Sequence, residues 1–210
     1  LRGHGESTAG DEGYGIPRLA DDLATLLQAL DPHDAVVVGH SMGGMISGLL
    51  TAEHPEQVQR IVFMSSAGVA FNENDFARQV LKGYNPFAEY EADALLSFMK
   101  TYVFADPPYI PKALINVIVA QRAAKKEFER TVFTQIRTGP EAFLLQQRLP
   151  DITQPVGLLW CDQDRIIDPS AAAVFAKGLQ RSETRILSGC GHMPMMEQPE
   201  QVAAFLLSRF

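Results

Sequence analysis

Hydrophobic residues form short runs toward both ends of this 210-residue chain. These runs predict strands over residues 35–38, 60–64, 156–160 and 184–187. Helices are predicted between and after them, over residues 17–30, 45–54, 170–179 and 199–209. The run at 35–38 contains no polar position, so we expect that strand to be buried on both faces.

The middle of the chain, residues 69–149, has a different pattern. It contains no strong strand run, and it predicts helices over residues 73–82, 88–103, 110–119, 121–137 and 140–147. The region is rich in large apolar side chains, most of which we expect to pack helix on helix or onto the sheet. Some of that apolar surface must face a site beneath it, which predicts an apolar pocket rather than a polar one.

A glycine-rich motif, Gly39-His40-Ser41-Met42-Gly43-Gly44, connects the strand at 35–38 to the helix at 45–54. This is the strand–turn–helix context of a Gly-x-Ser-x-Gly nucleophile elbow. The turn is tight, so we expect a side chain at position 39 or 43 to collide with its neighbours. The Ser41 hydroxyl is then held at the end of the strand. The Met42 amide lies at the positive end of the helix, where an oxyanion can be bound.

The motif alone is weak, because a turn of small residues between any strand and helix can have the same sequence. Two further segments strengthen the catalytic interpretation. The strand at 156–160 runs into acidic residues, and the strand at 184–187 leads to His192, which follows Gly189 and Gly191. Serine, aspartate and histidine therefore follow three strands in the order used by α/β-hydrolases.

On these motifs the chain resembles the α/β-hydrolase superfamily over essentially its whole length. The motifs that match the family in order are the opening loop Leu1-Arg2-Gly3-His4-Gly5-Glu6-Ser7, the elbow at 39–44, the acid strand at 160–164, and the histidine loop Gly191-His192-Met193-Pro194 with Glu197 and Pro199. Residues 133–179 look most like the monoacylglycerol-lipase-type and related bacterial lipase branch.

The resemblance implies an α/β fold, that of the α/β-hydrolases, with a mostly parallel sheet. Residues 1–68 and 150–210 correspond to the hydrolase core, and residues 69–149 correspond to a helical cap inserted into it. The four strands correspond to the last four of the family's sheet. We therefore expect an amino-terminal portion of the domain, with the second oxyanion-hole donor, to be missing from this sequence.

The family's chemistry implies a role for each site residue. Ser41 is the expected nucleophile, and it needs a base because a serine hydroxyl is nearly inert at neutral pH. His192 is the expected base, and later the acid that protonates the leaving alcohol. Met42 supplies an oxyanion-hole amide. No metal or organic cofactor is implied, and no group of residues has metal-ligand spacing.

Asp164 is the expected acid, which orients the histidine and stabilises the imidazolium. Asp162 and Asp168 are its rivals in the same loop. The segment departs from the family pattern because Cys161 stands where glycine is common. Counting from Trp160 still favours Asp164.

The other histidines have weaker claims to a catalytic role. His4 belongs to the opening loop and is expected to shape the site from its rim. The side chain of His40 is expected to point away, because neighbouring residues of a strand face opposite sides. His33 and His54, in a turn and at a helix end, are expected on the surface.

The net charge of −7 argues against a nucleic-acid partner. No stretch approaches the ~20 apolar residues of a membrane span. The interleaved charges at 121–130 predict a solvated helix face, with a membrane-docking face as the alternative.

The two cysteines give no disulfide framework. Cys161 and Cys190 follow strands predicted to be neighbours, one beside the acid and the other beside the histidine. Two buried free thiols are expected, because free cysteine behaves as a small hydrophobe. A disulfide between them is the alternative.

Three functions remain open. The first is a serine carboxylic ester hydrolase that acts on acylglycerols or medium-chain acyl esters through an acyl-enzyme, with a small apolar ester as partner. The second keeps the triad but cleaves a carbon–carbon bond, a lactone or a thioester. His40 and Met193 count against carbon–carbon cleavage, since those enzymes often carry asparagine and tryptophan there. The third is a non-catalytic receptor that retains a hydrolase pocket.

Overall fold

The computed structural model describes residues 1–8, 13–32, 34–138 and 140–208. Its centre is a four-stranded parallel sheet in the order β1-β2-β3-β4. The strands are β1 (Val36–His40), β2 (Arg60–Met64), β3 (Val156–Cys161) and β4 (Ser182–Leu187). The four predicted strands are confirmed, and β4 begins two residues before its apolar run.

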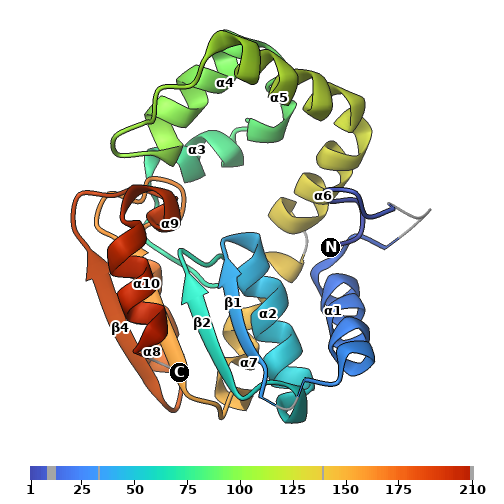
Figure 1. Ribbon diagram of the computed structural model, residues 1–210, viewed down its shortest axis with the longest axis vertical. Helices are drawn as coiled ribbons and strands as arrows, with labels where there is room; N and C mark the ends of the chain where they lie inside the picture. Colours follow the sequence, from blue (N-terminus) through green and yellow to red (C-terminus); the bar gives the residue numbers. More distant parts are fainter. Residues whose placement is uncertain (9–12, 33, 139, 209–210) are drawn as a thin grey trace.

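Helices cover both faces of the sheet, because successive residues of β2 and β3 are apolar on both sides. Ile61, Phe63, Leu158 and Trp160 belong to one buried cluster, which also contains residues of α1 (Ile16–Leu30), α2 (Met42–Glu53) and α8 (Ser170–Gly178). Val62, Met64 and Leu159 belong to a second cluster with α10 (Pro199–Leu207). Figure 1 shows the strands between these layers.

β1 forms one edge of the sheet in the described chain. It pairs with β2 alone, and Val38 is 42% exposed. The expectation that this strand is buried on both faces is therefore wrong for the described residues. Near this edge, the opening loop is tied to α1 by two contacts from Arg2 to the Asp22 carboxylate, at 2.6 and 2.8 Å.

In the described residues, the segment between β2 and β3 forms a helical insertion. Its elements are α3 (Asp75–Leu81), η2 (Pro86–Ala88), α4 (Ala92–Phe98), the π-helical turn η3 (Met99–Val103), α5 (Lys112–Ala124), α6 (Lys126–Thr138), η4 (Pro140–Phe143), α7 (Leu144–Arg148) and η5 (Leu149–Asp151). Helices α3 to α6 arch over the carboxyl ends of the strands (Figure 1). α7 instead packs with α2, and its Leu145 is buried in the first cluster.

The helix boundaries differ from the predicted ones where tertiary contacts intervene. The helix predicted at 88–103 is shortened to α4 and continues as η3. The break expected near residue 120 lies at Lys125 instead, where the side-chain Nζ donates to the carbonyls of Gly3 and Gly5 at 3.1 and 2.8 Å. No proline or glycine marks that position, so the sequence pattern did not locate it.

Two short helices complete the described chain, η1 (Pro55–Gln57) and α9 (Pro194–Glu197). The final predicted helix reaches residue 209, whereas α10 ends at Leu207, and residues 209–210 lie outside the described part. Among the helices of the described ranges, none has both the length and the apolarity required to cross a bilayer.

The turn between β1 and α2 is crowded at Gly39 rather than at Gly43. A Cβ on Gly39 would lie 2.6 Å from the Gly44 Cα and 2.7 Å from the Gly43 carbonyl oxygen. A Cβ on Gly44 would overlap the Ser66 side chain, whereas one on Gly43 would meet nothing within 4 Å. The expected collision is therefore confirmed at 39 and wrong at 43.

This difference predicts unequal effects of two alanine substitutions. In Gly39→Ala the added methyl must displace the backbone of Gly43 and Gly44. We expect this to lower the free energy of unfolding by about 1–3 kcal/mol. Gly43→Ala enters open space within α2, so we expect a change of at most about 1 kcal/mol, toward higher stability. Urea unfolding of both variants measures the two values, and equal losses would contradict the assignment.

Candidate active site

Ser41 sits in a strained backbone conformation at the start of α2. Its φ of 52° and ψ of −123° fall where non-glycine residues are rare. The Ser41 amide donates to the carbonyl of Met64 at 3.1 Å, and its carbonyl accepts from Ala67 at 3.1 Å. Such strain costs about 1–3 kcal/mol and is found mainly at functional sites. The turn therefore has the strained strand-to-helix geometry of a nucleophile elbow.

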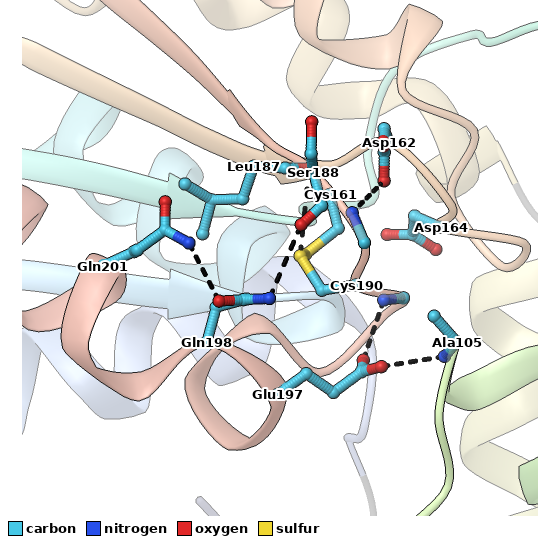
Figure 2. The surroundings of a disulfide bond; sticks show 12 residues. Ala105, Cys161, Asp162, Asp164, Leu187, Ser188, Cys190, Glu197, Gln198 and Gln201 are labelled. Carbon is cyan, nitrogen blue, oxygen red and sulfur yellow. Dashed lines mark hydrogen bonds between the residues drawn. A yellow bond between two sulfur atoms is a disulfide. The ribbon is translucent and has the colours of Figure 1, made fainter.

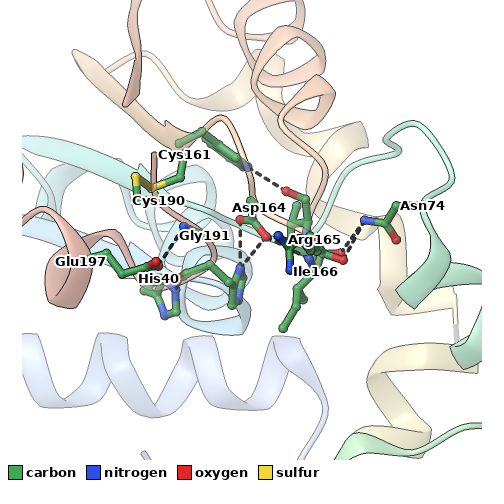
Figure 3. Close-up of polar contacts among 12 residues, drawn as sticks. His40, Asn74, Cys161, Asp164, Arg165, Ile166, Cys190, Gly191 and Glu197 are labelled. Carbon is green, nitrogen blue, oxygen red and sulfur yellow. Dashed lines mark hydrogen bonds and ion pairs between the residues drawn. A yellow bond between two sulfur atoms is a disulfide. The ribbon is translucent and has the colours of Figure 1, made fainter. Parts of the chain in front are cut away.

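Asp164 and His192 meet beyond the ends of β3 and β4. The histidine Nδ1 lies 3.0 and 3.1 Å from the two carboxylate oxygens. Both side chains are buried, at 0% exposure for Asp164 and 6% for His192. The amides of Ile166 and Ile167 also donate to Asp164 Oδ1, each at 3.0 Å. Figure 3 shows Asp164 beside Arg165 and Ile166 of the same loop.

The other two candidate aspartates have different partners. Asp162 Oδ1 accepts the amide of Gly189 at 2.8 Å (Figure 2). Asp168 Oδ1 accepts the amide of Ser170 at 2.9 Å, at the start of α8. Of the three, Asp164 is the aspartate that the fold brings to His192.

His40, which precedes Ser41 in sequence, is the residue that connects the elbow to this pair. The ring of His40 is 4.8 Å from the His192 ring between centroids. Within the described ranges, no hydrogen bond joins the Ser41 hydroxyl to the imidazole. Catalytic hydrogen bonds are often long in free enzymes and shorten when substrate binds.

His40 points toward the site, so the expectation from strand alternation is wrong. Its Nε2 donates to the carbonyl of His192 at 2.7 Å. Burial, and secondly the neighbouring His192, lower the pKa of His40 to about 4. The ring is therefore neutral near pH 7, with its proton on the nitrogen that donates. The alternation of side chains along a strand did not predict this direction, because His40 is the last residue of β1, where the chain turns into the elbow.

Cys161 and Cys190 form a disulfide, so the expectation of two free thiols is wrong. Their strands are neighbours in the sheet, and the two carboxyl ends bring the sulfurs together. The bond joins the loop of the acid to the loop of the histidine, as Figure 2 shows. Cys161 precedes Asp164 by three residues, and Cys190 precedes His192 by two.

An apolar cavity of about 320 Å³ lies under the helical insertion. Its lining includes Ala67, whose amide donates to the Ser41 carbonyl, and Ile166, whose amide donates to the Asp164 carboxylate. Aromatic side chains from the insertion contribute Phe71, Phe76 and Phe133. The predicted apolar pocket is thus present beside the elbow and the acid loop.

A second cavity, of about 240 Å³, is lined by Met42 and by residues of α6. Phe133 and Ile136 of α6 line both cavities. The second cavity also has polar walls, formed by His4, Lys125 and Glu129. His4 therefore shares a cavity with Met42, and its ring lies 5.3 Å from that of Phe128 between centroids.

The remaining two histidines are His33 and His54, and neither has a described contact with Ser41, Asp164 or His192. His54 is half-buried near Glu56, with Nδ1 3.7 Å from Oε1, away from the elbow. His33 lies outside the described residues.

Comparison with known proteins agrees with the fold. Residues 1–205 match the pattern that defines the Alpha/beta hydrolase family. The chain is 28% identical over 182 residues to monoacylglycerol lipase ABHD6 of Bos taurus, which covers 81% of this chain and 53% of the relative. It is 30% identical over 192 residues to Lipase 1 of Psychrobacter immobilis, which covers 86% of this chain and 57% of the relative.

Among solved structures, a bacterial virulence factor described as a membrane phospholipase A superposes with a TM-score of 0.91 and 31% identity. The match covers 99% of this chain and 68% of that one. The CarC serine hydrolase of carbazole degradation superposes with a TM-score of 0.83 at 23% identity, which shows the fold alone. The chain belongs to the alpha/beta hydrolase family. It spans about half the length of the curated relatives it matches.

The disulfide predicts that reduction loosens the loops that carry Asp164 and His192. A cross-link that closes a loop of this length, 29 residues, contributes roughly 3–4 kcal/mol to stability. We expect a loss of that size in urea unfolding of the reduced protein, together with lower activity. A Cys161→Ala/Cys190→Ala double variant is the control, since reductant should not change it further. Alkylation of two free thiols in the native, unreduced protein would contradict the pairing.

Proposed function

We propose that this chain carries the catalytic core of a serine carboxylic ester hydrolase acting on acylglycerols or medium-chain acyl esters. The observation that carries the proposal is the buried Asp164–His192 pair beside the strained Ser41 turn. The names of the curated relatives, monoacylglycerol lipase and lipase, support the same class of substrate.

In this proposal Ser41 attacks the ester carbonyl while His192 takes the hydroxyl proton. Asp164 accepts from Nδ1, which leaves Nε2 as the base and stabilises the imidazolium that forms. The Met42 amide donates to the oxyanion, which collapses to an acyl-enzyme and releases the alcohol with the proton from His192. Water activated by His192 then attacks the acyl group and frees Ser41.

The two cavities suggest where the parts of the ester bind. The apolar cavity next to Ala67 suits the acyl chain, because its walls are aliphatic and aromatic apart from Glu73. The cavity next to Met42 suits the alcohol, because His4, Lys125 and Glu129 offer polar groups there. Residues 69–149 would then act as a cap that separates both parts from solvent, with Phe133 between them.

The same residues could instead cleave a lactone, a thioester or a carbon–carbon bond. A lactone-degrading relative, Est816, superposes with a TM-score of 0.77 and 26% identity. The apolar cavity favours the acyl ester, because a straight hydrocarbon chain fills it without burying polar groups.

An acyl-chain series tests the proposed function. Full-length protein is assayed on monoacylglycerols and acyl nitrophenyl esters of increasing chain length, with one lactone and one thioester of matched acyl length. We expect kcat/KM to be highest for medium-chain esters, since a cavity of about 320 Å³ holds about ten groups of the size of a water molecule.

Ser41→Ala is the control, and we expect it to lower kcat by at least about 10³-fold. Preference for the lactone or thioester would favour the alternative chemistry. Binding of the esters without turnover, unaffected by Ser41→Ala, would favour a receptor and overturn the proposal.

A further inference from the structure

The main chain of the catalytic histidine loop is held by the helical insertion. The amide of His192 donates to the carbonyl of Val103 at 2.8 Å, at the end of η3. On the opposite side, the His192 carbonyl accepts from His40. The position of the imidazole therefore depends on a segment more than eighty residues away in sequence.

The insertion backbone packs directly onto Gly191. A Cβ at Gly191 would lie 2.7 Å from the Val103 carbonyl oxygen and 2.8 Å from the Ala105 amide nitrogen. Phe104, between these two residues, is buried at 2% exposure and anchors the segment. Only a glycine allows the histidine loop and residues 103–106 to approach this closely.

One carboxylate bridges the two segments. Glu197 Oε1 accepts the amide of Gly191 at 2.8 Å. Its Oε2 accepts the amides of Ala105 and Asp106, at 2.8 and 3.3 Å. Figures 2 and 3 show Glu197 reaching the two segments. Hydrogen bonds to an ionised acceptor are stronger than neutral ones, so three donors on one carboxylate make a firm bridge.

The same insertion segment also contacts the acid loop. Arg165, next to Asp164, donates from Nη1 to the carbonyl of Thr101 at 3.1 Å, within η3. Asn74, which caps α3, donates to the carbonyls of Arg165 and Ile166 at 3.0 and 3.4 Å. π-Helical turns such as η3 are rare and are frequently found at functional sites. The insertion is thus bonded to both loops that carry the buried pair.

We propose that Glu197 is a positioning residue, which fixes the imidazole of His192 by clamping residues 103–106 of the insertion against the histidine loop. The proposal rests on the proposed function, because it assigns His192 the role of base. When the clamp is closed, the imidazole is held in line with Ser41. When the clamp opens, the histidine loop shifts, and a misplacement of 1 Å lowers a catalysed rate by about 10²-fold.

Substitutions of Glu197 and of its neighbour Glu200 test this role. Glu197→Ala removes both acceptors, and Glu197→Gln retains one oxygen. Glu200 is exposed at the start of α10 and has no described contact with the insertion, so Glu200→Ala and Glu200→Gln are matched controls. Kinetics are normalised to active sites titrated with a fluorophosphonate, so unfolded protein does not enter the rate.

We expect kcat per titrated site to fall about 10²-fold in Glu197→Ala, to an intermediate value in Glu197→Gln, and not at all in the controls. KM should stay within about threefold, because the cavities that bind substrate do not include Glu197. In hydrogen exchange, peptides covering 103–106 and 189–193 should lose protection together while β1 and β2 keep theirs.

A kcat per site within twofold of wild type in Glu197→Ala would overturn the proposal, as would loss of protection in 189–193 alone. If Glu197→Ala does not fold, Gly191→Ala replaces it, because an added methyl forces the same two segments apart without touching the carboxylate. Hydrogen exchange needs no substrate, so it separates a failure of the clamp from a failure of the proposed ester chemistry. If the wild-type protein cleaves no ester, comparison with Glu197→Ala still shows whether residues 103–106 and 189–193 lose protection together.

Discussion

The contact between Asp164 and His192 is the interaction on which the site depends. A buried carboxylate is costly unless hydrogen bonds satisfy its oxygens, and here the imidazole and the amides of Ile166 and Ile167 do so. Those donors come from two loops that are far apart in sequence. The loops must therefore be held in fixed positions relative to each other, and several surrounding contacts restrain them.

Three kinds of restraint hold the loops. The disulfide between Cys161 and Cys190 joins them covalently at their bases. His40 ties the carbonyl of His192 to the end of β1, one residue before Ser41. Glu197 hydrogen-bonds both the histidine loop and the segment after η3, so the helical insertion lines the cavities and also supports the loop that carries His192. A small displacement of any restraint is felt at the imidazole, because packed interiors transmit strain.

The sequence predicted the features that depend on local pattern. Apolar runs located the four strands, and the spacing of residues after them placed Ser41, Asp164 and His192 beyond the carboxyl ends of parallel strands. Contacts between distant segments were not predictable in this way. The direction of His40 and the bonds of Glu197 depend on how the turn and the insertion pack. The pairing of the cysteines remained open, because adjacency of strand ends permits a disulfide without requiring it.

The central claim is that Asp164, through His192, activates Ser41. It is tested most directly by the rate at which a fluorophosphonate labels the full-length protein, with the modified residue mapped by mass spectrometry. The claim predicts an adduct on Ser41, slowed by about 10⁴-fold in Asp164→Asn and little changed in Asp162→Asn. An adduct on another residue, or a rate in Asp164→Asn equal to that of Asp162→Asn, would contradict it.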